Sequence, residues 1–291
     1  MRYFKRTICF ILFSAFVILL TVYAAADALF ATRSSTTFLI CGIDDAAENT
    51  DTILLVKAEG DKQKITILQI PRDTYVKHEG RGVKINSIYP TARLKGVDRL
   101  EAMKQLTSFI ETEFGIEINA FLGLNTTSFV KIVDSVGGVT VELENDITID
   151  ESSGKTFKKG TNRLSGKDAL LFIRHRKSYP DADIGRINAQ KIFIKAFIAR
   201  LKELSFIELL SLPEIIISNT VTDISVSSLP ELAFLSQKEA WSNADFCRLP
   251  GSPILHSGKW YYDLNVCEAD RLLGELFERK HLLNEEDFMI N

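Results

Sequence analysis

The chain has 291 residues, of which 46% are hydrophobic and 25% charged, as in a folded protein with one large core or two smaller ones. Its formal net charge is −3, so the sequence excludes the strongly basic surface that nucleic-acid binding requires, and we expect no nucleic-acid partner. Four cysteines occur without the Cys and His spacing of a zinc site.

The N-terminus predicts a membrane anchor. Arg2, Lys5 and Arg6 precede a run without charge, residues 8–26. A helix of about 19 residues spans about 28 Å, close to the hydrocarbon thickness of a bilayer. Because a basic flank stays in the cytoplasm, we expect a single-pass protein with the rest of the chain outside the cell. A cleavable signal peptide is the alternative, since small residues suited to cleavage occupy 24–28.

Cys247 and Cys267 are the only cysteines in the last third of the chain. If that region lies outside the cell, a disulfide between them is expected. Closing such a loop would stabilise the fold by roughly 3 kcal/mol on the chain-entropy model. The alternative is two free thiols.

Strands and helices alternate along the chain. Short apolar runs predict strands over 38–42, 52–56, 65–70, 121–124 and 139–143. Amphipathic spacing and capping residues predict helices over 97–114, from Asn125 or Thr126 to 136, 165–174 and 185–210. An irregular polar segment is expected over 80–96, and a charged excursion that contains glycine over 146–162. The alternation predicts an α/β fold, with a mixed central β-sheet flanked by helices.

The C-terminal part is expected to be a small α+β subdomain, with a hairpin near 259–264 and a last helix over 268–279. The expected divisions are a cytoplasmic tail (1–7), a transmembrane anchor (8–28), a linker (29–36), a catalytic domain (37–210) and this subdomain (211–291).

A polar window lies between two apolar helical segments at 171–191. It holds Arg174, Arg176 and Arg186, and the pair Tyr179-Pro180 breaks the helix between them. Arginines clustered where one helix ends and another begins suit a doubly charged anion better than they suit solvent.

The helix after the break begins polar and continues apolar. Arg186, Gln190, Phe193 and Phe197 fall on one stripe at 4-3-4 spacing. The N-terminal end of a helix favours anions, so the stripe would suit a ligand with a phosphate head and an apolar tail. The alternative is that Phe193 and Phe197 belong to the core.

Two further polar features follow predicted strands. The loop after the first strand carries acidic residues including Asp44 and Asp51, hard oxygen ligands of the kind that hold Mg²⁺ together with substrate phosphates. Arg72 comes directly after the third strand, at Pro71. A solvated loop and a surface ion pair with Asp73 are the alternatives. Together with the arginine window, these features indicate a site for a pyrophosphate and a metal.

At these residues the chain resembles the LytR–CpsA–Psr family. Seven short motifs occur in the order seen in that family, which makes the resemblance specific. They are Gly42-Ile43-Asp44, Asn49-Thr50-Asp51-Thr52, Ile70-Pro71-Arg72-Asp73-Thr74, Val133-Asp134-Ser135-Val136-Gly137-Gly138-Val139, Leu164-Ser165-Gly166-Lys167-Asp168-Ala169-Leu170, Arg174-His175-Arg176 and Asp183-Ile184-Gly185-Arg186. The resemblance covers about 37–204. In one departure, Asn49 stands where the family usually has arginine.

The resemblance implies a membrane-anchored extracytoplasmic phosphotransferase of a Gram-positive-type bacterium. Such an enzyme moves a glycopolymer (teichoic acid, capsular or another wall polysaccharide) from a polyprenyl-pyrophosphate carrier in the membrane to a peptidoglycan hydroxyl. By position, Asp44 and Asp51 resemble the aspartates that act through Mg²⁺. The pyrophosphate clamp would comprise Arg72, Arg174, Arg176 and Arg186, with Gln190 and Asp183 as further polar positions of the site. Asp183 is also a candidate base, and Phe193 and Phe197 would line a lipid groove.

Two other classes of protein are alternatives. One is a module that binds a polyprenyl phosphate or a wall polymer without chemistry, which the absent arginine at position 49 favours. The other is a transcriptional regulator, against which the anchor, the outward topology and the lack of a helix-turn-helix pattern all argue.

Overall fold

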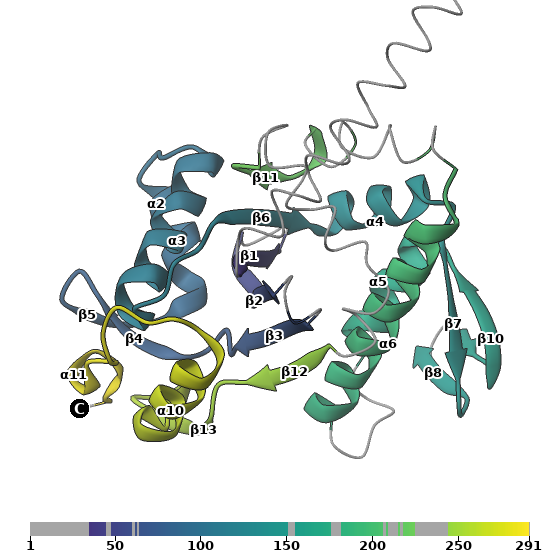
Figure 1. Cartoon of the computed structure of the whole chain (residues 1–291). Coiled ribbons are helices and arrows are strands. Elements are labelled where there is room, and N and C mark those ends of the chain that lie inside the picture. Colours follow the sequence, from purple (N-terminus) through teal and green to yellow (C-terminus); the bar gives the residue numbers. More distant parts are fainter. Residues whose placement is uncertain are drawn as a thin grey trace, which may run out of the picture.

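The computed structural model describes residues 35–44, 48–59, 62, 64–150, 155–175, 182–205, 208, 215, 218–224 and 244–290. The central feature of this part of the chain is a six-stranded mixed sheet (Figure 1). In sheet order its strands are β11 (Val221–Thr222), β6 (Ala120–Asn125), β1 (Thr36–Ile43), β2 (Thr50–Glu59), β3 (Lys64–Ile70) and β12 (Asp245–Arg248). β6 is parallel to β1 and β12 to β3, and the other neighbours are antiparallel. The expected mixed α/β architecture is confirmed.

One face of the sheet packs against helices in the main core. These helices are α2 (Ile88–Leu94), α3 (Arg99–Phe114), α10 (Val266–Leu276) and α11 (Glu285–Phe288). Alternate strand residues such as Leu39, Ile53 and Leu68 point into this core and are fully buried. α3 begins where the side chain of Asp98 accepts a hydrogen bond from the backbone N–H of Glu101.

A second core lies beside the sheet, on the right in Figure 1. It is formed by α4 (Thr126–Ser135), α5 (Gly166–Arg174), α6 (Ala182–Glu203), β7 (Val139–Leu143), β8 (Ile147–Asp150), β9 (Lys155–Phe157) and β10 (Gly160–Leu164). Ile194 of α6 packs against this core and also against apolar residues on the other face of the central sheet, among them Val56 and Ile67. α6 therefore connects the two parts of the molecule.

Close approaches in the second core require glycine at two positions. Gly138 has φ +83°, and a Cβ there would lie 2.6 Å from the carbonyl oxygen of Leu164. A Cβ on Gly166 would lie 2.3 Å from the carbonyl oxygen of Val130, where α5 crosses α4. The carboxylate of Asp134 accepts a hydrogen bond of 2.7 Å from the backbone N–H of Gly166. These residues of the sequence motifs therefore hold the fold together.

Two polar segments, of which 80–96 was expected to be irregular, contain regular structure. Residues 80–96 form β5 (Arg81–Lys84), which pairs with β4 (Tyr75–His78), then a 3-10 turn (Ile85–Ser87) and α2. The charged segment 146–162 contains β8, β9 and most of β10. The prediction for 80–96 was wrong because β5 and α2 are short, with four and seven residues, and Pro90 lies within α2.

Residues after 211 contribute to the central sheet. β11 and β12 are its two edge strands, and Leu264 and Leu273 lie in the main core. The expected hairpin comprises two strands, β13 (Gly251–His256) and β14 (Lys259–Leu264), and the last expected helix is α10. The central sheet therefore contains strands from both sides of the expected boundary between residues 210 and 211. The division into a catalytic domain and a C-terminal subdomain stays a prediction.

No disulfide joins Cys247 to Cys267, so that expectation is wrong. Cys247 is half-buried on β12 opposite Leu68, whereas Cys267 is exposed in the first turn of α10. Among the described residues, no helix combines the length and apolar character needed to cross a membrane. The expected anchor at 8–28 lies outside the described residues.

Candidate functional site

Strand pairing gathers several predicted site residues at one end of the sheet. β1 and β3 end there and β2 begins there, because β2 is antiparallel to both. The register pairs Gly42 with Thr52 but Ile43 with Thr50, which leaves Asp51 as the extra residue of a β-bulge. Bulges redirect side chains and are common beside active sites.

Asp51 and Arg72 form an ion pair, as their positions on neighbouring strands allow. The Nη1 atom of Arg72 donates to Oδ1 of Asp51 at 2.7 Å, and its Nε lies 3.6 Å from Oδ2 of Asp73. The second oxygen of Asp73 accepts from Lys84 at 2.7 Å. Burial lowers the pKa of Arg72, but the charges and hydrogen bonds of Asp51 and Asp73 outweigh burial and raise it. Arg72 therefore stays charged, and half-exposed, at the end of β3.

The loop between β1 and β2 is closed by its own backbone. The carbonyl oxygen of Asn49 accepts from the N–H groups of Asp44 and Asp51, at 2.8 and 3.1 Å. Glu48 has φ +52°, a conformation that is uncommon for a non-glycine residue and is kept only where the surroundings hold it. The loop thus fixes the backbones of both aspartates relative to each other.

The side chain of Glu48 ties this loop to the helices. Its Oε2 accepts from Nε of Arg93 on α2 at 3.1 Å, and its Oε1 accepts from Nη2 of Arg99 on α3 at 3.2 Å. Burial, and then the charge of Glu48, raise the pKa of the adjacent Tyr89. We call Glu48, Arg93 and Arg99 the Glu48 clamp.

The arginine window is only partly described. Arg174 is the last residue of α5, and Asp183, Arg186 and Gln190 lie in the N-terminal half of α6, but their side chains lie outside what the structure describes. Arg176 also lies outside the described residues. The helix junction itself agrees with the expected pattern, with α6 beginning at Ala182 and ending at Glu203 rather than spanning 185–210.

Phe193 and Phe197 lie on the side of α6 that faces the second core. Phe193 is 7% exposed, and its ring centroid lies 5.3 Å from that of Phe129 and 5.8 Å from that of Phe197. These contacts agree with the core-packing alternative. The contribution of the two side chains to lipid binding stays a prediction.

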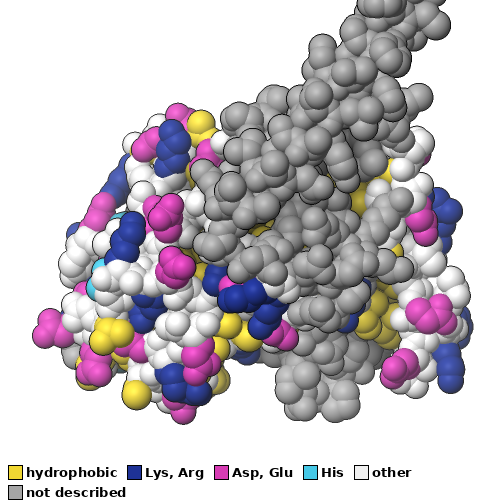
Figure 2. Space-filling view, viewed as in Figure 1, with side chains coloured by type: hydrophobic (Ala, Val, Ile, Leu, Met, Phe, Trp, Pro, Cys, Tyr) yellow, Lys and Arg dark blue, Asp and Glu magenta, His cyan; other side chains and the backbone are white. Residues whose placement is uncertain are grey.

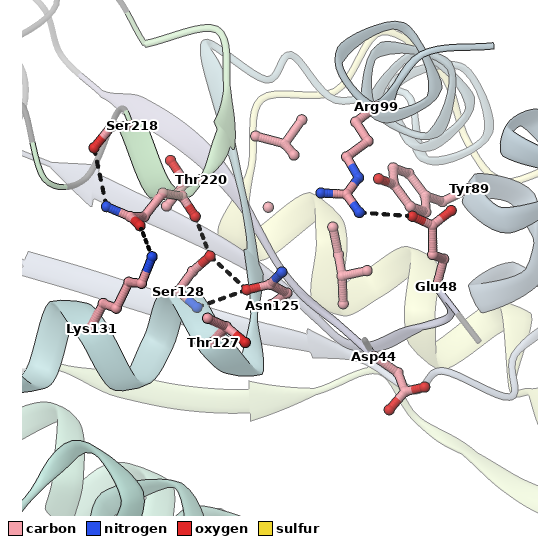
Figure 3. Close-up of a pocket in the computed structure, with 14 residues that line it drawn as sticks. Asp44, Glu48, Tyr89, Arg99, Asn125, Thr127, Ser128, Lys131, Ser218 and Thr220 are labelled. Atoms are coloured by element: carbon pink, nitrogen blue, oxygen red, sulfur yellow. Dashed lines mark hydrogen bonds and ion pairs between the residues drawn. The ribbon is translucent and has the colours of Figure 1, made fainter. Parts of the chain in front are cut away.

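A polar cavity of about 320 Å³ lies beside Asp44 (Figure 3). Its walls come from the end of β1, the end of β6, α3, α4 and residues 218–221. Side chains that line it include Glu48, Arg99, Asn125 and Lys131. Asp51 and Arg72 are not among its lining residues, so their ion pair lies outside the cavity.

The two aspartates suit a divalent cation in chemistry and in number. Mg²⁺ takes hard oxygen ligands and is usually held through one or two carboxylates together with substrate phosphates and water. Asp44 and Asp51 supply two carboxylates at the same end of the sheet, and Oδ1 of Asp51 is hydrogen-bonded to Arg72. Within the described ranges, no three His, Cys, Asp or Glu side chains form a metal site by themselves. The donor set therefore fits a cation that a phosphate ligand helps to hold.

Charges of both signs are interspersed over the described surface visible in Figure 2. The expectation of no nucleic-acid partner, which rests on the net charge of −3, stays a prediction.

Sequence reasoning missed the Glu48 clamp and Asn125 as parts of the site region. In the sequence Arg93 and Arg99 have the pattern of ordinary surface charges, and nothing in their spacing points to Glu48. Asn125 was identified only as a helix cap, a role that the structure confirms.

Comparison with known proteins places the chain in a family. The LytR_cpsA_psr family model matches residues 22–278. The chain is 32% identical over 255 residues to polyisoprenyl-teichoic acid–peptidoglycan teichoic acid transferase TagU of Oceanobacillus iheyensis, covering 85% of this chain and 77% of that protein. Its fold is similar to TagU of B. subtilis, with a TM-score of 0.63, 23% identity and coverage of 89% of this chain and 99% of that one. It is also similar to TagT bound to LIIa-WTA, with a TM-score of 0.66, 25% identity and coverage of 89% and 92%. The chain belongs to the LytR–CpsA–Psr family.

Proposed function

We propose that this protein transfers a teichoic acid glycopolymer from a polyprenyl-pyrophosphate carrier to a peptidoglycan hydroxyl. Membership of the family and the 32% identity to a teichoic acid transferase support this function. The structural observation that supports it best is the pairing of Arg72 with Asp51 at the end of the sheet, beside Asp44. The guanidinium of Arg72 is suited to bind a pyrophosphate directly, and the two carboxylates are suited to hold a Mg²⁺ that the phosphates also bind.

The reaction breaks one phosphorus–oxygen bond and forms another. A sugar hydroxyl of the acceptor attacks the phosphorus attached to the glycopolymer, and polyprenyl phosphate leaves. Negative charge develops on the leaving phosphate, where Arg72 and the arginines of the window stabilise it. The hydroxyl proton passes to a carboxylate, for which Asp183 and the aspartates at the sheet end are the candidates.

Asp44 and Asp51 would hold Mg²⁺ together with the phosphates of the donor. The cation would supply charge stabilisation to the phosphoryl oxygens. Independently of it, the Asn49 carbonyl keeps the backbones of the two aspartates in place, and Arg72 orients the carboxylate of Asp51. The binding site would therefore be largely formed before the donor arrives.

The lipid part of the donor would lie along the apolar side of α6. Phe193 and Phe197 are one candidate lining, although their ring contacts also serve packing. Ile194 faces the central sheet, where half-buried Ile40 and Leu54 border the buried apolar residues. The apolar surface between α6 and the central sheet is therefore a second candidate path for the lipid.

The protein would act at the outer face of the cell membrane, where its acceptor is located. Residues 8–28 would cross the membrane once with the N-terminus in the cytoplasm, and the catalytic domain would be outside. This topology places the site close to a carrier lipid in the same membrane.

The test is transfer by the full-length chain in detergent, with a lipid-linked donor, Mg²⁺ and peptidoglycan fragments. We expect Arg174→Ala and Arg186→Ala to lower the transfer rate at least about 100-fold, because each removes a cation from the pyrophosphate. Arg271→Ala is the matched control, since Arg271 is an exposed arginine of α10 that pairs only with Glu275 among the described residues. Near-normal transfer by both variants would contradict the site. Donor that binds without turnover in the wild type would instead indicate a binding module.

A further inference from the structure

The cavity beside Asp44 has the properties of a sugar site. Its lining residues include two that carry a carboxylate (Asp44 and Glu48) and two that carry a cation (Arg99 and Lys131), so their formal charges sum to zero. Its volume of about 320 Å³ is at the lower end of the roughly 300–1,000 Å³ typical of ligand pockets. A neutral lining rich in hydroxyl and amide groups favours an uncharged ligand that forms many hydrogen bonds over a polyanion.

The polar groups of one wall are held in fixed orientations. Oδ1 of Asn125 caps α4 by accepting from the backbone N–H of Ser128 at 2.7 Å and from its hydroxyl at 2.6 Å. This cap fixes the plane of the amide, so its Nδ2 group points away from Ser128 and toward the cavity (Figure 3). Nδ2 has no hydrogen-bond partner among the described residues, although it is a strong donor.

The neighbouring groups are fixed as well. Nζ of Lys131 donates to Oδ1 of Asn219 at 3.0 Å, and the amide of Asn219 donates to the carbonyl of Ile215 at 2.7 Å. On the opposite wall, Glu48 holds the guanidinium of Arg99. Donors and acceptors fixed in this way can bind the hydroxyls of a sugar ring at little cost in conformational entropy.

We propose that this cavity binds an uncharged sugar unit of the acceptor glycan, and so orients the attacking hydroxyl toward the phosphates. This inference rests on the proposed function. The cavity borders Asp44 but not the ion pair of Arg72 with Asp51, so its occupant would lie next to the pyrophosphate and not on it. The acceptor is the substrate that must approach the phosphorus from outside the donor. A polymer linked by phosphates would instead require a net positive lining.

The experiment measures binding of an uncharged N-acetylglucosamine tetramer to the full-length chain in detergent, without donor. The informative variant is Asn125→Asp, which keeps the oxygen that caps α4 but replaces the Nδ2 donor with an acceptor oxygen. We expect it to weaken tetramer binding at least fivefold, and Thr127→Val, which removes a hydroxyl from the same wall, to weaken it at least twofold.

The matched control is Asn265→Asp. Asn265 caps α10 in the same way, with its Oδ1 accepting from the backbone N–H of Glu268, and it lies outside the cavity. We expect tetramer binding by this variant to equal that of the wild type. Thermal unfolding of both aspartate variants shows whether the two caps are intact.

Steady-state transfer then distinguishes the two possible sources of the sugar. If the cavity binds acceptor, Asn125→Asp raises the apparent KM for peptidoglycan fragments at least fivefold, with a smaller change in the apparent KM for donor. A rise confined to the donor KM would assign the cavity to the donor and overturn the proposal. Equal tetramer binding by Asn125→Asp and wild type would also overturn it. Failure of the proposed function would differ, because Arg174→Ala and Arg186→Ala would then keep transfer while tetramer binding still depended on Asn125.

Discussion

Two ion-pair networks lie at the same end of the central sheet, and they have opposite arrangements. In one, the Arg72 network, an arginine lies between the carboxylates of Asp51 and Asp73. In the other, the Glu48 clamp, a carboxylate lies between Arg93 and Arg99. The side chains of Arg72 and Asp51 are each 38% exposed, whereas that of Glu48 is 26% exposed.

The difference shows which network can bind a ligand. Each oxygen of Glu48 accepts from one arginine, so the charge of this carboxylate is balanced within the protein. Arg72 uses Nη1 and Nε for its aspartates, and Nη2 has no carboxylate contact among the described residues. Because a guanidinium has five N–H donors, Arg72 can bind a phosphate without losing its protein partners. One network therefore positions the loop, while the other is open to substrate.

Removing Arg72 tests the open network and should have the largest effect on activity. We expect Arg72→Ala to lower the transfer rate about 100-fold or more, and Arg72→Lys to lower it at least tenfold because lysine lacks the planar fork. The free energy of unfolding should change by less than about 1 kcal/mol, since the ion pair is half-exposed. Rates from the purified chain and chemical denaturation measure the two effects. A loss of stability that accounts for the loss of rate would contradict a role in binding.

Breaking the Glu48 clamp should have an intermediate effect. Glu48→Gln keeps the size of the side chain but removes the charge that holds Arg93 and Arg99. We expect transfer to fall about five- to tenfold, and stability by about 1 kcal/mol, because the loop that carries Asp44 is less well held.

Glu48→Gly separates the carboxylate from the backbone of the same residue. Glycine adopts the φ of +52° without strain, so this variant removes the clamp and relieves the backbone together. If the carboxylate positions the loop, Glu48→Gly should lose transfer as Glu48→Gln does. Full activity in both variants would show that the loop needs no clamp.

Lys84→Met should have the smallest effect. Lys84 contacts one oxygen of Asp73, while the other oxygen faces Arg72. We expect the transfer rate to stay within about twofold and the stability within about 0.5 kcal/mol, because the pair is partly exposed. Thermal unfolding and transfer rates provide the measurement. A fall as large as that of Arg72→Ala would mean that Lys84 takes part in the site.

The sequence predicts the residues at strand ends well and the contacts between distant segments poorly. Asp51 and Arg72 could be placed together because Asp51 precedes the first strand of one predicted hairpin and Arg72 follows the second, and the register then brings them into contact. The β-bulge that sets the direction of Asp51 depends on pairing between β1 and β2 and leaves no local pattern.

The clamp was missed for a related reason. Its residues come from a loop and two helices. α2 has seven residues and contains Pro90, so the helical spacing of its buried residues Ile88, Tyr89 and Ala92 extends over little more than one turn. The edge strands β11 and β12 have two and four residues, respectively, so the contribution of the C-terminal region to the sheet could not be seen either.

The position of β12 has a consequence for the order of folding. β12 lies in parallel beside β3, and Lys57 of β2 donates to the carbonyl of Leu276, 219 positions along the chain. Until the C-terminal region has emerged, β3 is an open edge able to pair with another chain. Contacts over such separations form slowly, so the sheet that carries Asp51 and Arg72 is complete only after nearly the whole chain has emerged. A truncation before residue 245 would remove no predicted site residue, yet it would leave a chain prone to aggregation.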